Sequence, residues 1–222
     1  MMTGSALLQR RLAVLMGLAS LLPALFAACG GPASPSSTSA AAPPAAPSGA
    51  SLQLSSPAFA DGGALPAKYT CKSQSGLGVE TNPPLAWSSP PAGTAGYVLL
   101  ASTVANEAGV QTTKYNWVLY SIPSSATAIP EDNTVIITGN SGTTQVGTPG
   151  LTSDGPQFSY SPPCSPKGSE LRTYTFTLYA LSASPVFTPN RAPGAGGDGA
   201  NLAAALPGIT IGKASITAGY TF

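Results

Sequence analysis

The chain has 222 residues, 8% of them charged, and a formal net charge of +1 at pH 7. This balance excludes the basic stripe of a nucleic-acid-binding surface, so we expect no nucleic-acid partner. The absence of histidine excludes Ser-His-Asp and Cys-His catalysis and removes imidazole as a metal ligand. We therefore expect no cofactor and no bound metal, and an enzyme is the weakest functional hypothesis.

The first 28 residues have the layout of a bacterial lipoprotein signal peptide. Arg10 and Arg11 form a positively charged start, and residues 12–26 form an apolar run that is short for a bilayer span. Small residues precede Cys29, although Phe26 stands where the lipobox usually has leucine. We predict lipidation of Cys29 and attachment to the periplasmic side of the inner or outer membrane, or to the cell surface. The alternatives are an ordinary signal peptide and an uncleaved anchor.

The segment that follows Cys29 predicts a disordered tether. Residues 30–51 contain only Gly, Pro, Ala, Ser and Thr, so the segment has no large apolar group whose burial offsets the entropy of ordering it. Fully extended, such a tether reaches about 65 Å from the membrane. The sequence therefore divides into a signal peptide (residues 1–28), a lipidated cysteine with its tether (29–51) and one folded domain (52–222).

The folded domain has the pattern of a mainly β protein. The clearest predicted strand is 173–181, in which Tyr174 and Phe176 face one way and the intervening threonines the other. The runs 97–103 and 115–122 predict buried strands. Weaker strand candidates are residues 134–138, 145–146 and 209–220. Strands separated by loops rich in proline and glycine favour a sandwich or a barrel.

One short helix is predicted over residues 202–206, capped by Asp198 or Asn201 and ended by Pro207 and Gly208. The glycine-rich stretch 194–199 fits a flexible loop, because no strand leads into it as a phosphate-binding loop requires. The adjacent carboxylates of Glu131 and Asp132, like the lysines, fit solvent-facing positions.

Two cysteines remain after Cys29. An exported protein matures in an oxidising compartment, so Cys71 and Cys164 are predicted to form a disulfide; two free buried thiols are the alternative.

Six short motifs in the folded part carry a family resemblance. They include Asn82-Pro83-Pro84-Leu85-Ala86-Trp87 and Asn116-Trp117-Val118-Leu119-Tyr120, and all six lie, in order, at residues 54–71, 82–87, 91–94, 116–123, 163–168 and 174–181. Their order and spacing resemble the phosphatidylethanolamine-binding protein family, in its bacterial Raf-kinase-inhibitor-like branch, over about residues 52–219. The resemblance implies an antiparallel β-sandwich with one or two short peripheral helices and a small anion pocket near one end.

The residues that line this family's pocket are largely replaced here. Ser102 and Thr103 stand near the usual paired aspartates, Asn116 replaces a histidine before Trp117, and Leu171 stands where histidine is usual. Hydroxyls and an amide offer hydrogen bonds but neither charge nor titration. Arg172 is the strong candidate anion partner and Lys114 a looser one. The resemblance therefore implies an anion pocket that is weakened or repurposed.

These observations lead to two main functional hypotheses. The first is a non-catalytic module that binds a small neutral or weakly anionic ligand, such as a lipid headgroup; besides Ser102 and Arg172, its candidate lining residues are Tyr69, Asn116, Trp117, Tyr160 and Pro163. The alternative is a protein-interaction or inhibitor module with a relic pocket, in which a surface loop over residues 106–113 contacts an unidentified partner. An equally open interpretation is that Asn116 and Trp117 are only part of a packed strand.

Overall fold

The computed structural model describes residues 51–73, 80–107, 109–133, 136–138, 141–153, 160–164, 171–189 and 197–221. All of them belong to the unit Ala46–Phe222, the second of two into which the chain divides. The predicted signal peptide, Cys29 and nearly all of the predicted tether lie outside the described residues and stay predictions. In the part that is described, no helix is long and apolar enough to cross a membrane.

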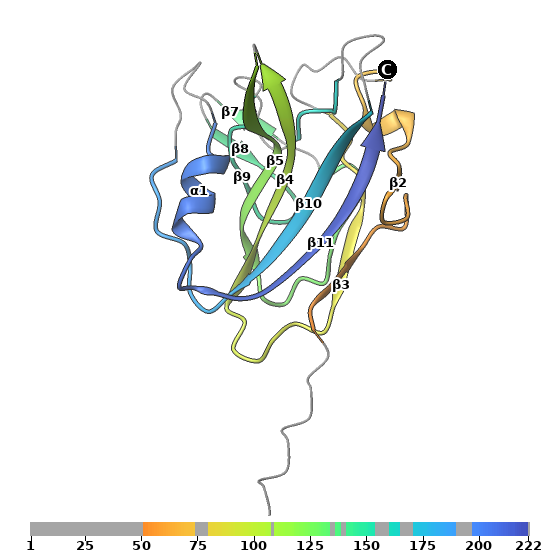
Figure 1. Ribbon diagram of the computed structural model, residues 1–222. Coiled ribbons are helices and arrows are strands. Elements are labelled where there is room, and N and C mark those ends of the chain that lie inside the picture. The colour runs from red at the N-terminus through yellow and green to blue at the C-terminus, as the bar shows by residue number, and fades with distance from the viewer. Residues whose placement is uncertain are drawn as a thin grey trace, which may run out of the picture. The chain divides into compact units, whose positions relative to one another are not determined.

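A six-stranded sheet forms the centre of the fold (Figure 1). Its four long strands are β4 (Gly96–Glu107), β5 (Val110–Pro123), β10 (Arg172–Leu181) and β11 (Thr210–Tyr220). The strand order is β2-β11-β10-β4-β5-β9, and the short strand β2 (Gly63–Ala64) runs parallel to β11, whereas the other neighbours are antiparallel. The other edge strand is β9 (Thr148–Pro149).

A smaller sheet covers one face of the large one. It contains β1 (Gln53–Ser55), β3 (Leu85–Ser88) and β6 (Ala128–Ile129), in the order β1-β3-β6. Two further elements are a separate hairpin of β7 (Ile136–Thr138) and β8 (Ser141–Thr143), and the short 3-10 helix η1 (Ala67–Tyr69).

The main core fills the space between the two sheets. Leu54 and Trp87 of the small sheet join Leu99 and Phe176 of the large sheet in one buried cluster. In β10 the predicted alternation is confirmed, because Tyr174, Phe176 and the other apolar residues of that face are buried. Each large apolar side chain removed from water contributes about 1.5–3 kcal/mol. The observed arrangement confirms the predicted mainly antiparallel β-sandwich.

A helix covers part of the opposite face of the large sheet (Figure 1). The helix α1 spans Gly199–Ala205, slightly earlier than predicted, and Leu202 is buried against Val98 and Val118. The predicted cap is confirmed in its position at Asp198 but not in its side-chain contact. Asp198 occupies the N-cap position without a side-chain bond to the helix; its carboxylate instead accepts a bond from the Leu151 N–H at 2.8 Å, and Asn201 lies inside the helix.

Several predicted strand boundaries also differ. The strand predicted over 97–103 extends to Glu107, and the one predicted from 115 begins at Val110. The predicted loop over 106–113 is therefore the end of a β-hairpin, in which Glu107 pairs with Val110. Gly109 in its two-residue turn has φ of +84°, which glycine adopts without steric cost.

The strand predicted at Gln145 and Val146 was wrong. Both residues lie in a bend, because Asn133 exchanges two side-chain hydrogen bonds with the backbone of Val146, at 2.9 and 3.1 Å, in place of a strand partner. The strand predicted over 134–138 is confirmed at Ile136–Thr138, and residues 134–135 lie outside the described residues.

Candidate functional site

The pairing between β4 and β10 ends before either strand does. Their last paired residues are Thr103 and Tyr174, and beyond this point Thr173 pairs with β11 while Val104 pairs with β5. The Thr103 hydroxyl donates a 2.8 Å hydrogen bond to the Thr173 carbonyl, in the position where the next backbone pair would form. The two strands therefore diverge from a point held by one side-chain hydrogen bond.

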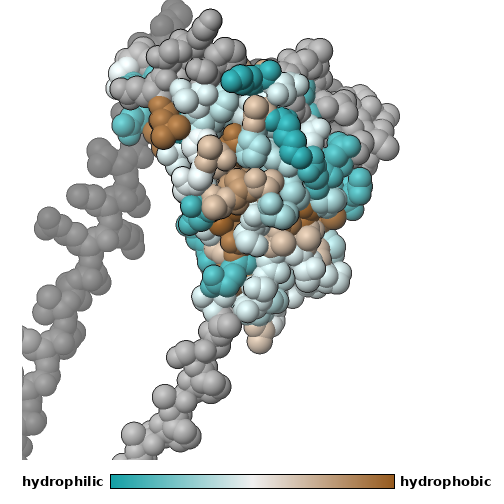
Figure 2. Space-filling view, turned by 90° about the vertical axis from the view of Figure 1, so that its right-hand side faces the viewer, coloured by the Kyte–Doolittle hydropathy of each residue, from teal (hydrophilic) through white to brown (hydrophobic). Residues whose placement is uncertain are grey.

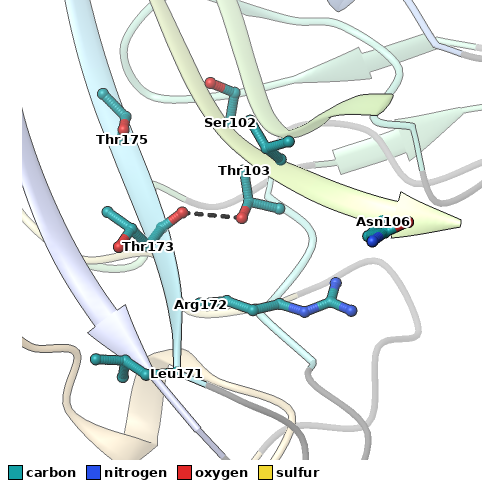
Figure 3. Close-up of a pocket in the computed structure, with 8 residues that line it drawn as sticks. Ser102, Thr103, Asn106, Leu171, Arg172, Thr173 and Thr175 are labelled. Carbon is teal, nitrogen blue, oxygen red and sulfur yellow. Dashed lines mark hydrogen bonds between the residues drawn. The ribbon is translucent and has the colours of Figure 1, made fainter. Parts of the chain in front are cut away.

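A hollow of about 460 Å³ lies in this divergence, and we call it the fork pocket (Figure 3). The β4 side contributes hydroxyl, amide and aliphatic groups, and the β10 side contributes hydroxyl groups and one cation. The lining residues are Ser102, Thr103, Val104, Asn106, Leu171, Arg172, Thr173 and Thr175. The volume falls in the range of about 300–1,000 Å³ that is usual for small-ligand sites.

The chemistry of the fork pocket is that of a mildly cationic, hydroxyl-rich site. Figure 3 shows the Arg172 side chain extending across the divergence toward Asn106. Among the described residues the ion pair is that of Lys68 with Glu131, so Arg172 has no carboxylate partner there. Val104 and Leu171 add exposed apolar surface at 57% and 68% exposure. The pocket can thus exchange hydrogen bonds with a ligand, pair with one negative charge and contact a small apolar group.

Three predicted lining residues lie together elsewhere, inside the core. Tyr69, Trp117 and Tyr160 are each no more than 2% exposed. The Tyr160 hydroxyl donates to the Tyr69 carbonyl at 2.6 Å, and the rings of Trp117 and Tyr160 meet edge to face, with centroids 5.4 Å apart. Burial raises the pKa of Tyr160 well above its ordinary value, and the neighbouring Tyr174 and Tyr69 add to the effect. These rings fill space that an open pocket would need.

Asn116 and Pro163 are also buried, beside this aromatic cluster. The Asn116 carbonyl accepts a bond from the Ser161 N–H at 2.6 Å, and the Pro163 carbonyl accepts one from the Cys71 N–H at 3.1 Å. Of the predicted site residues, Ser102 and Arg172 line the fork pocket. Lys114 lies opposite Thr103 in the β4–β5 pair and is not among the lining residues.

The structure confirms the predicted disulfide between Cys71 and Cys164. It joins the segment after η1 to the segment that contains Pro163, next to the Cys71–Pro163 backbone bond. The bridge therefore holds in place the two segments that supply Tyr69 and Tyr160.

A second hollow, of about 290 Å³, lies beside Tyr69 and contains Lys68, Glu131 and three prolines. Lys68 donates to one Glu131 carboxylate oxygen at 2.8 Å and the Tyr69 hydroxyl to the other at 3.0 Å. The hydrogen bond from Lys68, followed by that from Tyr69, lowers the pKa of Glu131, and the same bond to Glu131 raises the pKa of Lys68. Because these charged groups already bind one another, this hollow is a weaker candidate ligand site than the fork pocket.

Sequence reasoning did not place Val104, Thr173 and Thr175 in a site, and it placed Asn106 only in a loop that contacts a partner. Thr173 and Thr175, which alternate with the buried Tyr174 and Phe176 of β10, line the fork pocket. In the described part of the chain no group of three or more potential metal ligands comes together.

Comparisons with known proteins agree with the geometry. A family model described as "Phosphatidylethanolamine-binding protein" matches residues 55–221. A UPF0098 protein of Mycobacterium tuberculosis is 34% identical over 142 residues, which cover 64% of this chain and 60% of the relative's length. The protein named "Putative lipoprotein LppC" of the same species is 29% identical over 182 residues, covering 82% and 78% of the two chains.

A solved structure shares the fold. Escherichia coli YbcL, described as a member of the mammalian phosphatidylethanolamine-binding family, superposes with a TM-score of 0.61 at 21% identity and covers 78% of this chain and 99% of its own. The match of the family model to most of the folded domain and the shared sandwich lead to one conclusion. The chain belongs to the phosphatidylethanolamine-binding protein family.

Proposed function

We propose that this protein is a non-catalytic binding module of the cell envelope, which holds a small, weakly anionic ligand such as a lipid headgroup in the fork pocket. One observation carries the proposal. Arg172 lines a hydroxyl-rich hollow and has no carboxylate partner among the described residues, whereas Lys68 is paired with Glu131. A guanidinium presents a planar set of donors that matches a carboxylate or a phosphate.

The lining also supports a role without catalysis. Arginine stays protonated at every physiological pH, and serine, threonine and asparagine side chains do not titrate there. General acid–base catalysis needs a group that gains and loses a proton near the working pH, and the described lining supplies none. Binding is the use that these residues support best.

The envelope location rests on different observations. Cys29 follows an apolar run and small residues, and a relative that matches 82% of this chain is named as a lipoprotein. Membrane attachment through Cys29 is therefore part of the proposal.

Thermal unfolding of the full-length protein tests the binding role. We expect phosphate, phosphoethanolamine or acetate to raise the unfolding midpoint, because a ligand bound only to the folded state stabilises it by about 2.7 kcal/mol at a hundred times its dissociation constant. Arg172→Gln should abolish the shift. Lys213→Gln, which removes a cation of β11 outside the fork pocket, is the matched control and should retain it. A shift that survives Arg172→Gln contradicts this site.

A second candidate function is protein interaction through the β4–β5 hairpin. Here the favouring observation is that Val104 and Val110, near the end of the hairpin, are 57% and 64% exposed. Replacing both valines by serine should remove a cross-linked partner in intact cells, whereas Ile211→Ser, at a 40% exposed position in β11, should not. Retention of the partner by the double variant counts against this function.

A further inference from the structure

The fork pocket is bounded by an unpaired strand edge. From Val104 to Glu107, β4 pairs with β5 on one side, and among the described residues it has no strand on the other. An unpaired edge presents backbone N–H and C=O groups that a further strand can bind. Here the edge is not in open solvent but forms one wall of the hollow that contains Arg172.

The register shows which backbone groups face the fork. Tyr174 pairs with Thr103, so an extended ladder would place Thr173 opposite Val104. The Thr173 carbonyl points toward β4, since the Thr103 hydroxyl donates to it at 2.8 Å. Because backbone groups alternate along a strand, Val104 and then Asn106 direct their N–H and C=O groups away from β5 and toward the fork. Thr103 and Tyr174 form a non-hydrogen-bonded pair, so the Val104 N–H takes the last ladder position, opposite the Thr173 carbonyl. In the described part of the chain, the Val104 C=O and both backbone groups of Asn106 remain for a further strand. Both residues line the pocket.

Charge and apolar surface restrict what such an edge accepts. Arg172 extends across the fork toward Asn106 (Figure 3) and favours an acidic partner. Val104 and Leu171 provide exposed aliphatic contacts on the two sides. Main-chain acceptors and donors, a carboxylate and small apolar side chains occur together in a short extended peptide, whereas inorganic phosphate offers only the charge.

Resting on the proposed function of the fork pocket, we infer that its ligand is a short extended peptide segment. The segment adds as a strand to the edge of β4 at Asn106 and the Val104 carbonyl, and its carboxylate, at a side chain or at the chain terminus, pairs with Arg172. Main-chain hydrogen bonds along the edge supply affinity that tolerates different sequences, and the guanidinium supplies the preference for an acidic group.

The test uses the ¹⁵N-labelled full-length protein and a pool of acetylated pentapeptides with random side chains and a free carboxyl terminus. We expect the amide signals of Val104 and Asn106 to shift. The same pool with amidated termini should bind roughly ten- to a hundredfold more weakly, and Arg172→Gln should cause a similar loss. Asn106→Pro removes one edge N–H and should weaken binding about tenfold, whereas Asn106→Ala retains that donor and most of the binding.

A pool methylated at alternate peptide nitrogens examines the same hydrogen bonds from the ligand side and does not depend on how Asn106→Pro folds. Equal binding by the methylated and parent pools overturns strand addition. Binding of acetate and phosphate that depends on Arg172, with no tighter binding of the peptides, also overturns it and leaves the proposed function standing. If peptides, acetate, phosphate and phosphoethanolamine all fail to bind, the proposed function fails as well.

Discussion

Two cations of this protein occupy contrasting environments. Lys68 has both a carboxylate at 2.8 Å and the Tyr69 ring, whose centroid lies 4.8 Å from its ammonium. Arg172 lies at the divergence of two strands, with hydroxyl and amide groups around it and no carboxylate partner among the described residues. A cation whose partner is already in place supports the fold. One without such a partner is available to a ligand.

The Lys68–Glu131 pair leads to a prediction about pH. The pKa of Glu131 is lowered below its usual 4.5 in the folded protein, so its contribution to stability is present above pH 4.5 and is lost as pH falls through the lowered value. The pKa of Lys68 is raised above 10.5, so its contribution is complete below pH 10.5 and is lost as pH rises through the raised value.

We expect Glu131→Gln to remove part of the acid sensitivity of urea unfolding measured below pH 4.5, and the effect should shrink in high salt because both side chains are exposed. Asp132→Asn, at the adjacent exposed carboxylate, is the control for a simple change in net charge. Identical acid profiles of the wild type and Glu131→Gln would show that the pair has no energetic role.

At the scale of elements, the fork exists because β4 belongs to two partnerships of unequal length. Its pairing with β5 continues to the hairpin turn at Glu107 and Val110, so β4 keeps this ladder to its end without β10. β10 in turn keeps its pairing with β11 up to Arg172 and Tyr220. Each strand can leave the other near Thr103 because each retains one complete ladder.

The helix α1 provides a prediction at this scale. Asp198 is 2% exposed and accepts the Leu151 N–H at 2.8 Å, while the Asp198 N–H donates to the Leu151 carbonyl at 2.8 Å. Asp198→Ala leaves a buried backbone donor without its acceptor, so we expect a loss of about 1–3 kcal/mol in the free energy of unfolding. Asn201→Ala, at an exposed helical position, should change it by less than about 0.5 kcal/mol. Equal losses for the two variants would contradict this assignment.

The disulfide is a second element-scale case. Cys71 and Cys164 are separated by 93 positions. Closing a loop of that length lowers the entropy of the unfolded chain and thereby raises the free energy of unfolding by roughly 4–5 kcal/mol. Urea unfolding of the Cys71→Ser/Cys164→Ser double variant should show a loss approaching this value. Cys29→Ala retains the bridge and should unfold like the wild type. A loss below about 1 kcal/mol in the double variant would mean that the aromatic cluster holds these segments without the bridge.

For the whole molecule, β1 and the fork pocket lie toward opposite ends of the sandwich (Figure 1). Gln53 of β1 pairs with Ser88, at the same end of the sheets as Gly96, where β4 begins, and the fork lies toward the other end of β4 (Figure 1). If the predicted tether leads from Cys29 to β1, it joins the domain at the end remote from the fork pocket.

The predicted lipid anchor leads to a prediction for the whole molecule. On the face shown in Figure 2, hydrophilic residues surround apolar ones that gather near the middle of the domain. We predict that Cys29→Ala transfers the protein from the membrane fraction to the soluble fraction of cells, because the predicted acylation of Cys29 would be lost. Quantitative immunoblotting of the two fractions is the measurement, with Cys71→Ser/Cys164→Ser as the cysteine control. A Cys29→Ala protein that stays in the membrane fraction contradicts the lipid anchor.

Local sequence by itself determined where the long central strands and the helix form. Alternation in 173–181 predicted β10 and its buried face, and the run before Pro207 predicted α1 to within a few residues. The motifs placed the chain in its family and thereby implied the sandwich. These features depend on neighbouring residues or on short motifs, which a single sequence displays directly.

Only the tertiary structure decided the site. The sequence identified Arg172 and Ser102 as candidates. Whether they line one pocket with Val104, Asn106 and Thr175 depends on where β4 and β10 stop pairing. That register joins segments about 70 positions apart. The same is true of Trp117 and Tyr160, which the packing of distant segments places in the core, and of Tyr69, which is buried beside them and also lines the second hollow. Contacts of this kind are fixed by how whole strands pack, and no local pattern records them.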